Sequence, residues 1–131
     1  MQEIIEFMKN AKITYLATVK EAQPIIRPMG SLMDVNGKLS FVTNNEKGIF
    51  LEIGENPNIE FCCIHGAKSL NISGKVFDNT NASAKEKVFE ISPATAKRYG
   101  GDDSTLAIVS FEKATAVFAD FKGNKEVIEI G

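Results

Sequence analysis

The chain has 131 residues, of which 44% are hydrophobic, so it is long and apolar enough to bury a core as a single domain over residues 1–131. Its net charge of −2 and pI near 5.5 exclude the broadly basic surface that nucleic acids and anionic membranes attract. No apolar run reaches the length of a membrane span, and the acidic, amphipathic stretch Met1–Phe7 lacks the features of a signal peptide, so we expect a cytoplasmic protein without nucleic-acid or membrane partners.

The first half of the chain alternates between helical and strand-like patterns. The expected elements are a helix over 2–10, strands over 13–19, 24–35 and 38–43, and a short helix over 46–54 that starts at Asn45 or Glu46. Pro28 and Gly30 interrupt the second strand, and proline within a strand indicates an edge or a bulge. Asn36-Gly37 is the strongest hairpin dipeptide and predicts that the next two strand segments pair.

The second half predicts a similar mixture. The expected elements are strands over 58–65 and 68–78, helices over 83–91 and 93–99, and strands over 105–111 and 114–121. Ser83-Ala84-Lys85-Glu86 has the pattern of a capping box, and Pro93 suits the first turn of a helix. Gly74 indicates a bulge in its strand.

These elements predict a mainly β, antiparallel fold with short flanking helices. The strands over 13–19 and 105–111 are apolar on both faces, which is unusual for a sheet with one wet face. This pattern favours a closed or half-closed barrel whose outside is covered by helices or by a second subunit.

The junction between the strand over 38–43 and the following helix is a candidate anion site. Thr43, Asn44 and Lys47 place a hydroxyl, an amide and an ammonium group beside a helix N-terminus, whose free N–H groups attract phosphate. The alternative is structural: Asn45 is then a helix N-cap and Lys47 a solvated surface residue.

Arg27 is the only charge within an apolar stretch of strand, next to Pro28, Met29 and Gly30. Its guanidinium can donate to a phosphate or to the acceptors of a planar cofactor, and Gly30 permits close approach of a flat ligand. The alternative is an edge-strand arginine that extends to water beside an ordinary bulge.

Cysteine and histidine give no catalytic or metal pattern. Cys62 and Cys63 are adjacent on a strand and point to opposite faces, so they are poorly placed for a mutual disulfide or for chelating one metal. We interpret them as small apolar strand residues. His65 is the only histidine and has no nucleophile motif around it, which favours an ordinary surface residue.

The order and spacing of several short motifs resemble a known family. These motifs are Thr18-Val19, Gln23–Pro28, Gly37–Asn44, Lys47, Asn56-Pro57, Ser73–Lys75 and the C-terminal hairpin of residues 106–121. Together they cover nearly the whole chain. In this arrangement the chain resembles the small, single-domain members of the pyridoxamine 5'-phosphate oxidase-like family of FMN-binding split β-barrels, which are antiparallel and Greek-key-like.

The resemblance implies FMN bound at a homodimer interface. It places Arg27, Pro28 and Met29 along the flavin ring. The residues expected at the ribityl phosphate are Thr43, Asn44 and Lys47.

The resemblance further implies an FMN-dependent oxidoreductase with a small-molecule substrate or electron donor that is not specified, and it names no catalytic residue. The alternatives are a non-catalytic flavin- or ligand-binding protein for storage or sensing, and a reductase that uses a deazaflavin. Ser69 and Asn71 stand where many small relatives carry a tryptophan and an arginine, which changes the contacts expected from the second subunit. The basic residues that bind pyridoxal phosphate in the full oxidases are missing, which argues against vitamin B6 oxidation.

Overall fold

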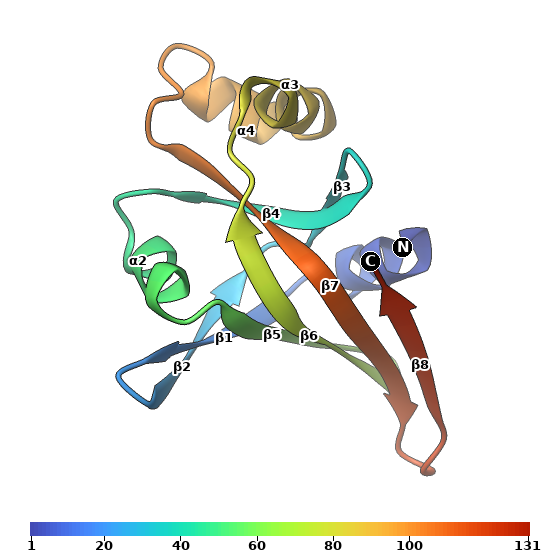
Figure 1. The fold of residues 1–131 in the computed structure, drawn as a ribbon. Helices are drawn as coiled ribbons and strands as arrows, with labels where there is room; N and C mark the ends of the chain where they lie inside the picture. The colour runs from blue at the N-terminus through green and yellow to red at the C-terminus, as the bar shows by residue number, and fades with distance from the viewer.

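The computed structural model describes all residues, 1–131, and consists of eight strands and four helices (Figure 1). The elements are α1 (Gln2–Ala11), β1 (Thr14–Lys20), β2 (Gln23–Met29), β3 (Met33–Val35), β4 (Lys38–Asn44), α2 (Gly48–Glu55), β5 (Asn58–His65), β6 (Lys68–Asp78), α3 (Ala82–Ile91), α4 (Pro93–Tyr99), β7 (Leu106–Asp120) and β8 (Lys125–Ile130). None of the helices is long and apolar enough to cross a membrane.

All strands join one antiparallel sheet in the order β2-β1-β5-β6-β7-β4-β3, with β8 also paired to β7. The long β7 reaches two partners on one side, because its first residues pair with β4 and its later residues pair with β8. The sheet curls around the core as a split barrel with β2 and β3 as its ends (Figure 1). The predicted mainly β, antiparallel split-barrel fold is confirmed.

The inside of the curled sheet holds the main core, which contains Leu16, Phe41, Phe61 and Ile72, all 2% exposed or less. Phe41 and Phe61 meet edge to face with ring centroids 5.5 Å apart, although they lie on strands that are not neighbours in the sheet. Helix α1 adds Ile4, Ile5 and Met8 to this core, and α2 adds Ile49 and Ile53. Helix α2 packs against both β1 and β4, so it bridges the open side of the barrel (Figure 1).

The outside of the sheet is covered on one part only. The first half of β7 is buried on both faces because Ile108 packs outward against Val88 and Ala84 of α3. The outside of β1 has no such cover, and Tyr15 there is 48% exposed. The sequence predicted a cover over the outer face of the strands that are apolar on both faces. Within this chain, helix α3 covers β7 in this way, and no element covers β1.

Several elements differ from the sequence prediction. The segment 24–35 forms two strands, β2 and β3, separated by Gly30 and its neighbours, and the segments 105–111 and 114–121 form the single strand β7. Strand β8 was not predicted. The N-cap of α3 is Asn81, whose side chain accepts from the Ala84 N–H at 2.8 Å, rather than Ser83 of the expected capping box.

The two glycine predictions have different outcomes: the turn at Asn36-Gly37 is present, and the strand irregularity expected at Gly74 lies just beyond it. Asn36 and Gly37 both have positive φ angles, 52° and 89°, which a two-residue hairpin turn requires, and they join β3 to β4. At Gly74 a Cβ atom would lie 2.2 Å from the main-chain oxygen of Lys113 on β7. No side chain fits there. The register irregularity itself lies one step later, between Lys75 and Val76.

Candidate functional site

The β4–α2 junction is longer than the sequence predicted. Helix α2 begins at Gly48, and not at Asn45 or Glu46, because Asn44 closes a turn first. The main-chain oxygen of Asn44 accepts from the Lys47 N–H at 3.0 Å, and the side-chain Oδ1 of Asn44 accepts from the Glu46 N–H at 2.8 Å. The N-cap is Lys47, which provides no side-chain cap. Asn45 is therefore not the N-cap, and its amide donates to the Ser104 oxygen at 3.1 Å instead.

This junction carries several hydrogen-bond donors that the chain does not use. The first two N–H groups of α2, those of Gly48 and Ile49, have no intrahelical acceptor and no side-chain cap, whereas the Phe50 N–H donates to the Lys47 oxygen at 3.1 Å. Lys47 forms no salt bridge. The Thr43 side chain is only 7% exposed, and its hydroxyl makes no hydrogen bond within the chain. A cation, a free hydroxyl and a helix N-terminus at one place suit the oxygens of an anion.

A cavity of about 190 Å³ opens beside the junction. Its lining residues come from two segments far apart in the sequence: Val42, Thr43 and Lys47 on one side, and Ala94, Thr95, Arg98 and Tyr99 of α4 on the other. A larger cavity of about 480 Å³ lies between α1, the β2–β3 connection and the α3–α4 segment. Neither cavity is lined by Arg27, Pro28, Met29 or Asn44.

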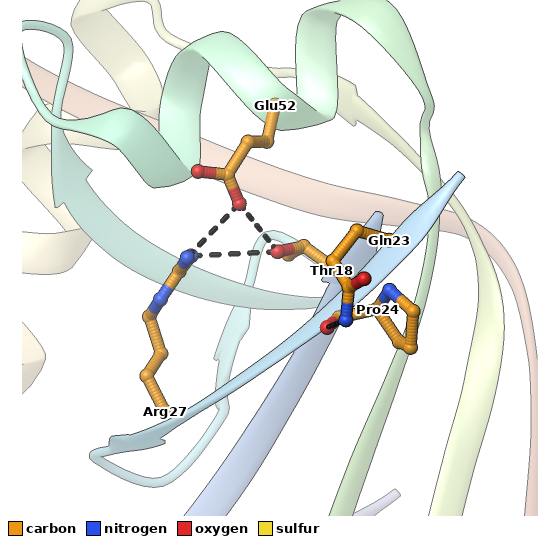
Figure 2. Close-up of polar contacts among 5 residues, drawn as sticks. All are labelled: Thr18, Gln23, Pro24, Arg27 and Glu52. Carbon is orange, nitrogen blue, oxygen red and sulfur yellow. Dashed lines mark hydrogen bonds and ion pairs between the residues drawn. The ribbon is translucent and has the colours of Figure 1, made fainter. Parts of the chain in front are cut away.

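Arg27 is paired within the chain. Its Nη2 lies 2.9 Å from Oε1 of Glu52 on α2, and the same oxygen accepts from the Thr18 hydroxyl of β1 at 2.7 Å. Arg27 Nη1 completes the triangle with a longer contact of 3.4 Å to the Thr18 oxygen (Figure 2). The guanidinium keeps further N–H donors that these contacts do not use. This triangle connects α2 with β1 and β2.

Glu52 is a carboxylate held in its charged form. It is 9% exposed, and burial alone would raise its pKa. The hydrogen bond from Thr18 acts most strongly in the other direction and, together with Arg27 and the charge of Lys20, holds the pKa of Glu52 below its usual value. Its Oε2 makes no hydrogen bond within the chain.

Glu52 was not among the predicted site residues, although its position in the sequence carries a signal. Glu52 follows Ile49 by three residues and precedes Ile53, so helical spacing places it on the same buried stripe as these two isoleucines. A charged residue on an apolar stripe needs a buried partner. Arg27, the only charge within its own apolar strand, is that partner.

The three residues expected at the flavin ring do not share one face of β2. Strand alternation places Arg27 and Met29 on the inner face and Pro28 on the outer face, where it pairs with Tyr15. Since β2 pairs only with β1, its other edge is free. A flat group lying along that edge reaches residues of both faces.

Cysteine and histidine take the positions expected from the sequence. Cys63 is buried, and burial together with the neighbouring Cys62 raises the pKa of the Cys63 thiol to about 11, so it stays protonated at neutral pH. Cys62 lies on the opposite face, with its Sγ 3.8 Å from Oδ1 of Asn71. His65 is exposed and contacts the Phe7 ring edge to face. The structure has no group of three His, Cys, Asp or Glu residues that could hold a metal ion.

Comparison with known proteins decides the family. No protein-family model and no curated protein matches the sequence. The crystal structure of a NimC/NimA family protein from Clostridium acetobutylicum is 30% identical, with a TM-score of 0.91, and the match covers 99% of this chain and 92% of that chain. The chain belongs to this family. Its split-barrel fold is shared with pyridoxamine 5'-phosphate oxidase-like proteins, which agrees with the resemblance in the sequence motifs.

More distantly related structures share the fold of this chain. A pyridoxamine 5'-phosphate oxidase-related, FMN-binding protein from Nostoc punctiforme is 11% identical with a TM-score of 0.57, covering 99% of this chain and 94% of that one. A heme-binding protein from Mycobacterium smegmatis is 13% identical with a TM-score of 0.70, covering 96% of this chain and 56% of that one. At these identities the comparison supports the architecture alone.

Proposed function

We propose that this NimC/NimA family protein binds FMN and acts as an FMN-dependent oxidoreductase on a small molecule. The observation that carries the proposal is the β4–α2 junction, where Thr43, Lys47 and the uncapped start of α2 offer unused donors beside a cavity. These groups fit a phosphate monoester by charge and by hydrogen bonding. Asn44 shapes the turn through its oxygen and keeps its amide N–H₂ group for the same anion.

The flavin ring is proposed to lie along the free edge of β2. Bound FMN would supply hydride or electron transfer. Arg27 would donate to the ring acceptors with the N–H groups that Glu52 and Thr18 leave free. Pro28 and Met29 would contact the ring from the outer and inner sides of the strand.

Glu52 would hold Arg27 in place for this role. The ion pair fixes the guanidinium against α2, and the N-cap of the same helix, Lys47, lies five residues before Glu52. Five residues of helix span about 7.5 Å. One short helix would therefore position a group at the phosphate and a group at the ring.

We also propose a homodimer in which a second copy covers the outer face of β2, β1, β5 and their neighbours. Antiparallel partners point to the same face, and the register brings four exposed apolar side chains onto it: Tyr15, Ile26, Ile64 and Val127, which are 48% to 69% exposed. An apolar area of this kind indicates an interface. Ser69 and Asn71 lie on the same face, so a partner subunit would meet them.

Heme fits the site less well than FMN. The only histidine, His65, lies at the end of β5 against Phe7 and lines none of the cavities beside the proposed site. The unused donors at the β4–α2 junction instead match a phosphate.

Purification gives the direct test of the function. We expect a yellow protein whose ligand, released by denaturation, has the mass and absorption spectrum of FMN. Reduction of the bound flavin by a nicotinamide nucleotide, followed by reoxidation with added acceptors through many turnovers, would identify an enzyme. Flavin that stays bound without turnover would favour a storage or sensing role, and a colourless apoprotein that does not bind added FMN would overturn the proposal.

A further inference from the structure

We propose that Arg98 of α4 is a second cationic ligand for the phosphate group, opposite Lys47 in the cavity that the two residues share. The identity of the phosphate compound rests on the proposed FMN binding, whereas the anion site itself does not. No local pattern selects Arg98, since its spacing is typical of an ordinary solvated helix face.

The cavity brings Arg98 and Lys47 together although they are 51 positions apart in the sequence. Its volume of about 190 Å³ corresponds to about six water molecules at the volume of liquid water, which is enough for a phosphate group with some solvent. Its polar lining consists of Thr43, Lys47, Thr95 and Arg98, and no acidic residue contributes. The cavity therefore carries a charge of +2 from its side chains.

Neither cation is neutralised elsewhere. The three salt bridges of the chain involve Arg27, Lys85 and Lys87, so Lys47 and Arg98 have no carboxylate partner within 4 Å. Arg98 is oriented by the ring of Tyr99, whose centroid lies 5.5 Å from the guanidinium carbon. Both side chains are exposed to solvent, and a dianion between them would be attracted by both charges.

A neutral hydroxyl adds a donor for the same ligand. Thr43 lines this cavity, and its hydroxyl makes no hydrogen bond within the chain. No buried side-chain polar atom of the chain lacks a partner, so this hydroxyl reaches solvent and is free to donate to a bound anion. The Thr95 hydroxyl instead remains hydrogen-bonded to the N-cap Ser92 of α4 at 2.8 Å.

The arrangement predicts a preference for phosphorylated over unphosphorylated ligands. Arg98 can donate two parallel hydrogen bonds to one phosphate, which Lys47 cannot do. Bound phosphate would also connect α4 to the β4–α2 turn. The site would therefore distinguish FMN from riboflavin mainly through these two cations.

The test compares Arg98→Ala with Lys97→Ala, which removes the same charge from the neighbouring, exposed residue that does not line the cavity. Dissociation constants for FMN and for riboflavin are measured by quenching of flavin fluorescence. We expect Arg98→Ala to weaken FMN binding by roughly tenfold or more, with riboflavin binding changed by less than about twofold. Lys97→Ala should change neither constant. An equal loss for both flavins, or no loss for FMN, would overturn the role of Arg98.

A second measurement keeps this inference separate from the proposed function. If the wild-type chain binds no flavin, inorganic phosphate is titrated in its place and followed by the amide NMR signals of residues 43–49 and 95–99. Saturable shifts in the wild type and in Lys97→Ala, lost in Arg98→Ala, would support the anion site while FMN binding fails. Absence of saturable shifts in the wild type would reject the site as well. Circular dichroism of each variant confirms that the fold is retained.

Discussion

Nη2 of Arg27 lies 2.9 Å from Oε1 of Glu52, and this contact joins an edge strand to the helix that spans the open side of the barrel. The side chains are 23% and 10% exposed, so the pair is shielded from water on most sides. Such a pair stabilises the fold less than its distance suggests, because both ions lose hydration. Removing one partner is costly, because it leaves the other charge partly buried and unpaired.

The first prediction concerns acid stability. Glu52→Gln should lower the free energy of unfolding at pH 7 by about 2 kcal/mol, the scale of a lost hydrogen bond between charged groups. The pKa of Glu52 is lowered in the folded state, so as the pH falls through about 4.5 the unfolded state takes up the proton first and the wild type loses this stabilisation. The gap between wild type and variant should therefore be full above that pH and shrink below it.

Urea denaturation between pH 3 and 7 measures this gap. Asp102 and Asp120 also have lowered pKa values from local hydrogen bonds, but they are present in both proteins and cancel in the comparison. A gap that is constant over the whole pH range would contradict the assigned charge state of Glu52.

The second prediction concerns the flavin potential. If Arg27 faces the ring, Arg27→Ala should lower both the reduction potential and the affinity of bound FMN, because the reduced flavin is anionic. Arg27→Lys should restore only part of this, since a point charge lacks the planar fork. Glu52→Gln should shift the potential in the opposite direction, because it removes the charge that offsets Arg27. Spectroelectrochemistry of the three variants measures the reduction potential of the bound flavin. A potential unchanged in Arg27→Ala would place Arg27 away from the ring.

The third prediction concerns Lys47. Lys47→Glu should weaken FMN binding by roughly 2 kcal/mol or more, because a charge-assisted hydrogen bond is lost and repulsion is added. Lys122→Glu makes the same charge change in the β7–β8 turn and should leave affinity unchanged. Titration calorimetry with FMN provides the comparison, and equal affinities for the two variants would remove Lys47 from the site.

The fourth prediction concerns the outer sheet face. Light scattering should give twice the 14.3 kDa chain mass for the wild type. The interface of this dimer should bury well over ~1,200 Å² in total. Tyr15→Glu should shift this mass towards the monomer, because it places a charge in the apolar interface. Ile91→Glu, at the end of α3 on another part of the surface, should remain dimeric. A wild-type monomer at low micromolar concentration with FMN still bound would contradict the proposed dimer.

The fifth prediction concerns two glycines. Gly74→Ala should destabilise the fold by roughly 2 kcal/mol or more, because its Cβ would collide with the Lys113 oxygen and force β6 and β7 apart. Gly54→Ala lies within α2 with open space around it and should instead stabilise by about 0.5–1 kcal/mol. Thermal unfolding of both variants measures these opposite signs.

Local patterns in the sequence were enough for much of the fold. The Asn36-Gly37 turn and the prolines of an edge strand follow from backbone chemistry at single positions, so they could be read without knowing the neighbours. Strand β8 contains three β-branched residues, Val127, Ile128 and Ile130, so a local signal was present. The strand is short and largely exposed, however, and its conformation depends on pairing with β7. The start of α2 was misplaced because Asn44 uses its own side chain to extend the turn.

The candidate site was harder to predict because its parts meet only in the folded chain. Arg27 and Lys47 carry local signals, a charge in an apolar strand and a cation near a helix start. Glu52 and Arg98 gain their significance from partners 25 and 51 positions away. No window of sequence long enough for one helix or strand contains both members of either pair.

The prolines of β2 have a consequence for how the molecule meets other chains. Pro24 and Pro28 lie at alternate positions with Ile26 between them, and proline in a paired edge strand points its nitrogen away from its neighbour. Among Pro24, Ile26 and Pro28, only Ile26 has an N–H group that could donate to a second strand pairing at that edge. A row of carbonyl groups with one donor is a poor template for intermolecular β-pairing. The barrel can thus leave this side open without exposing the protein to edge-to-edge aggregation.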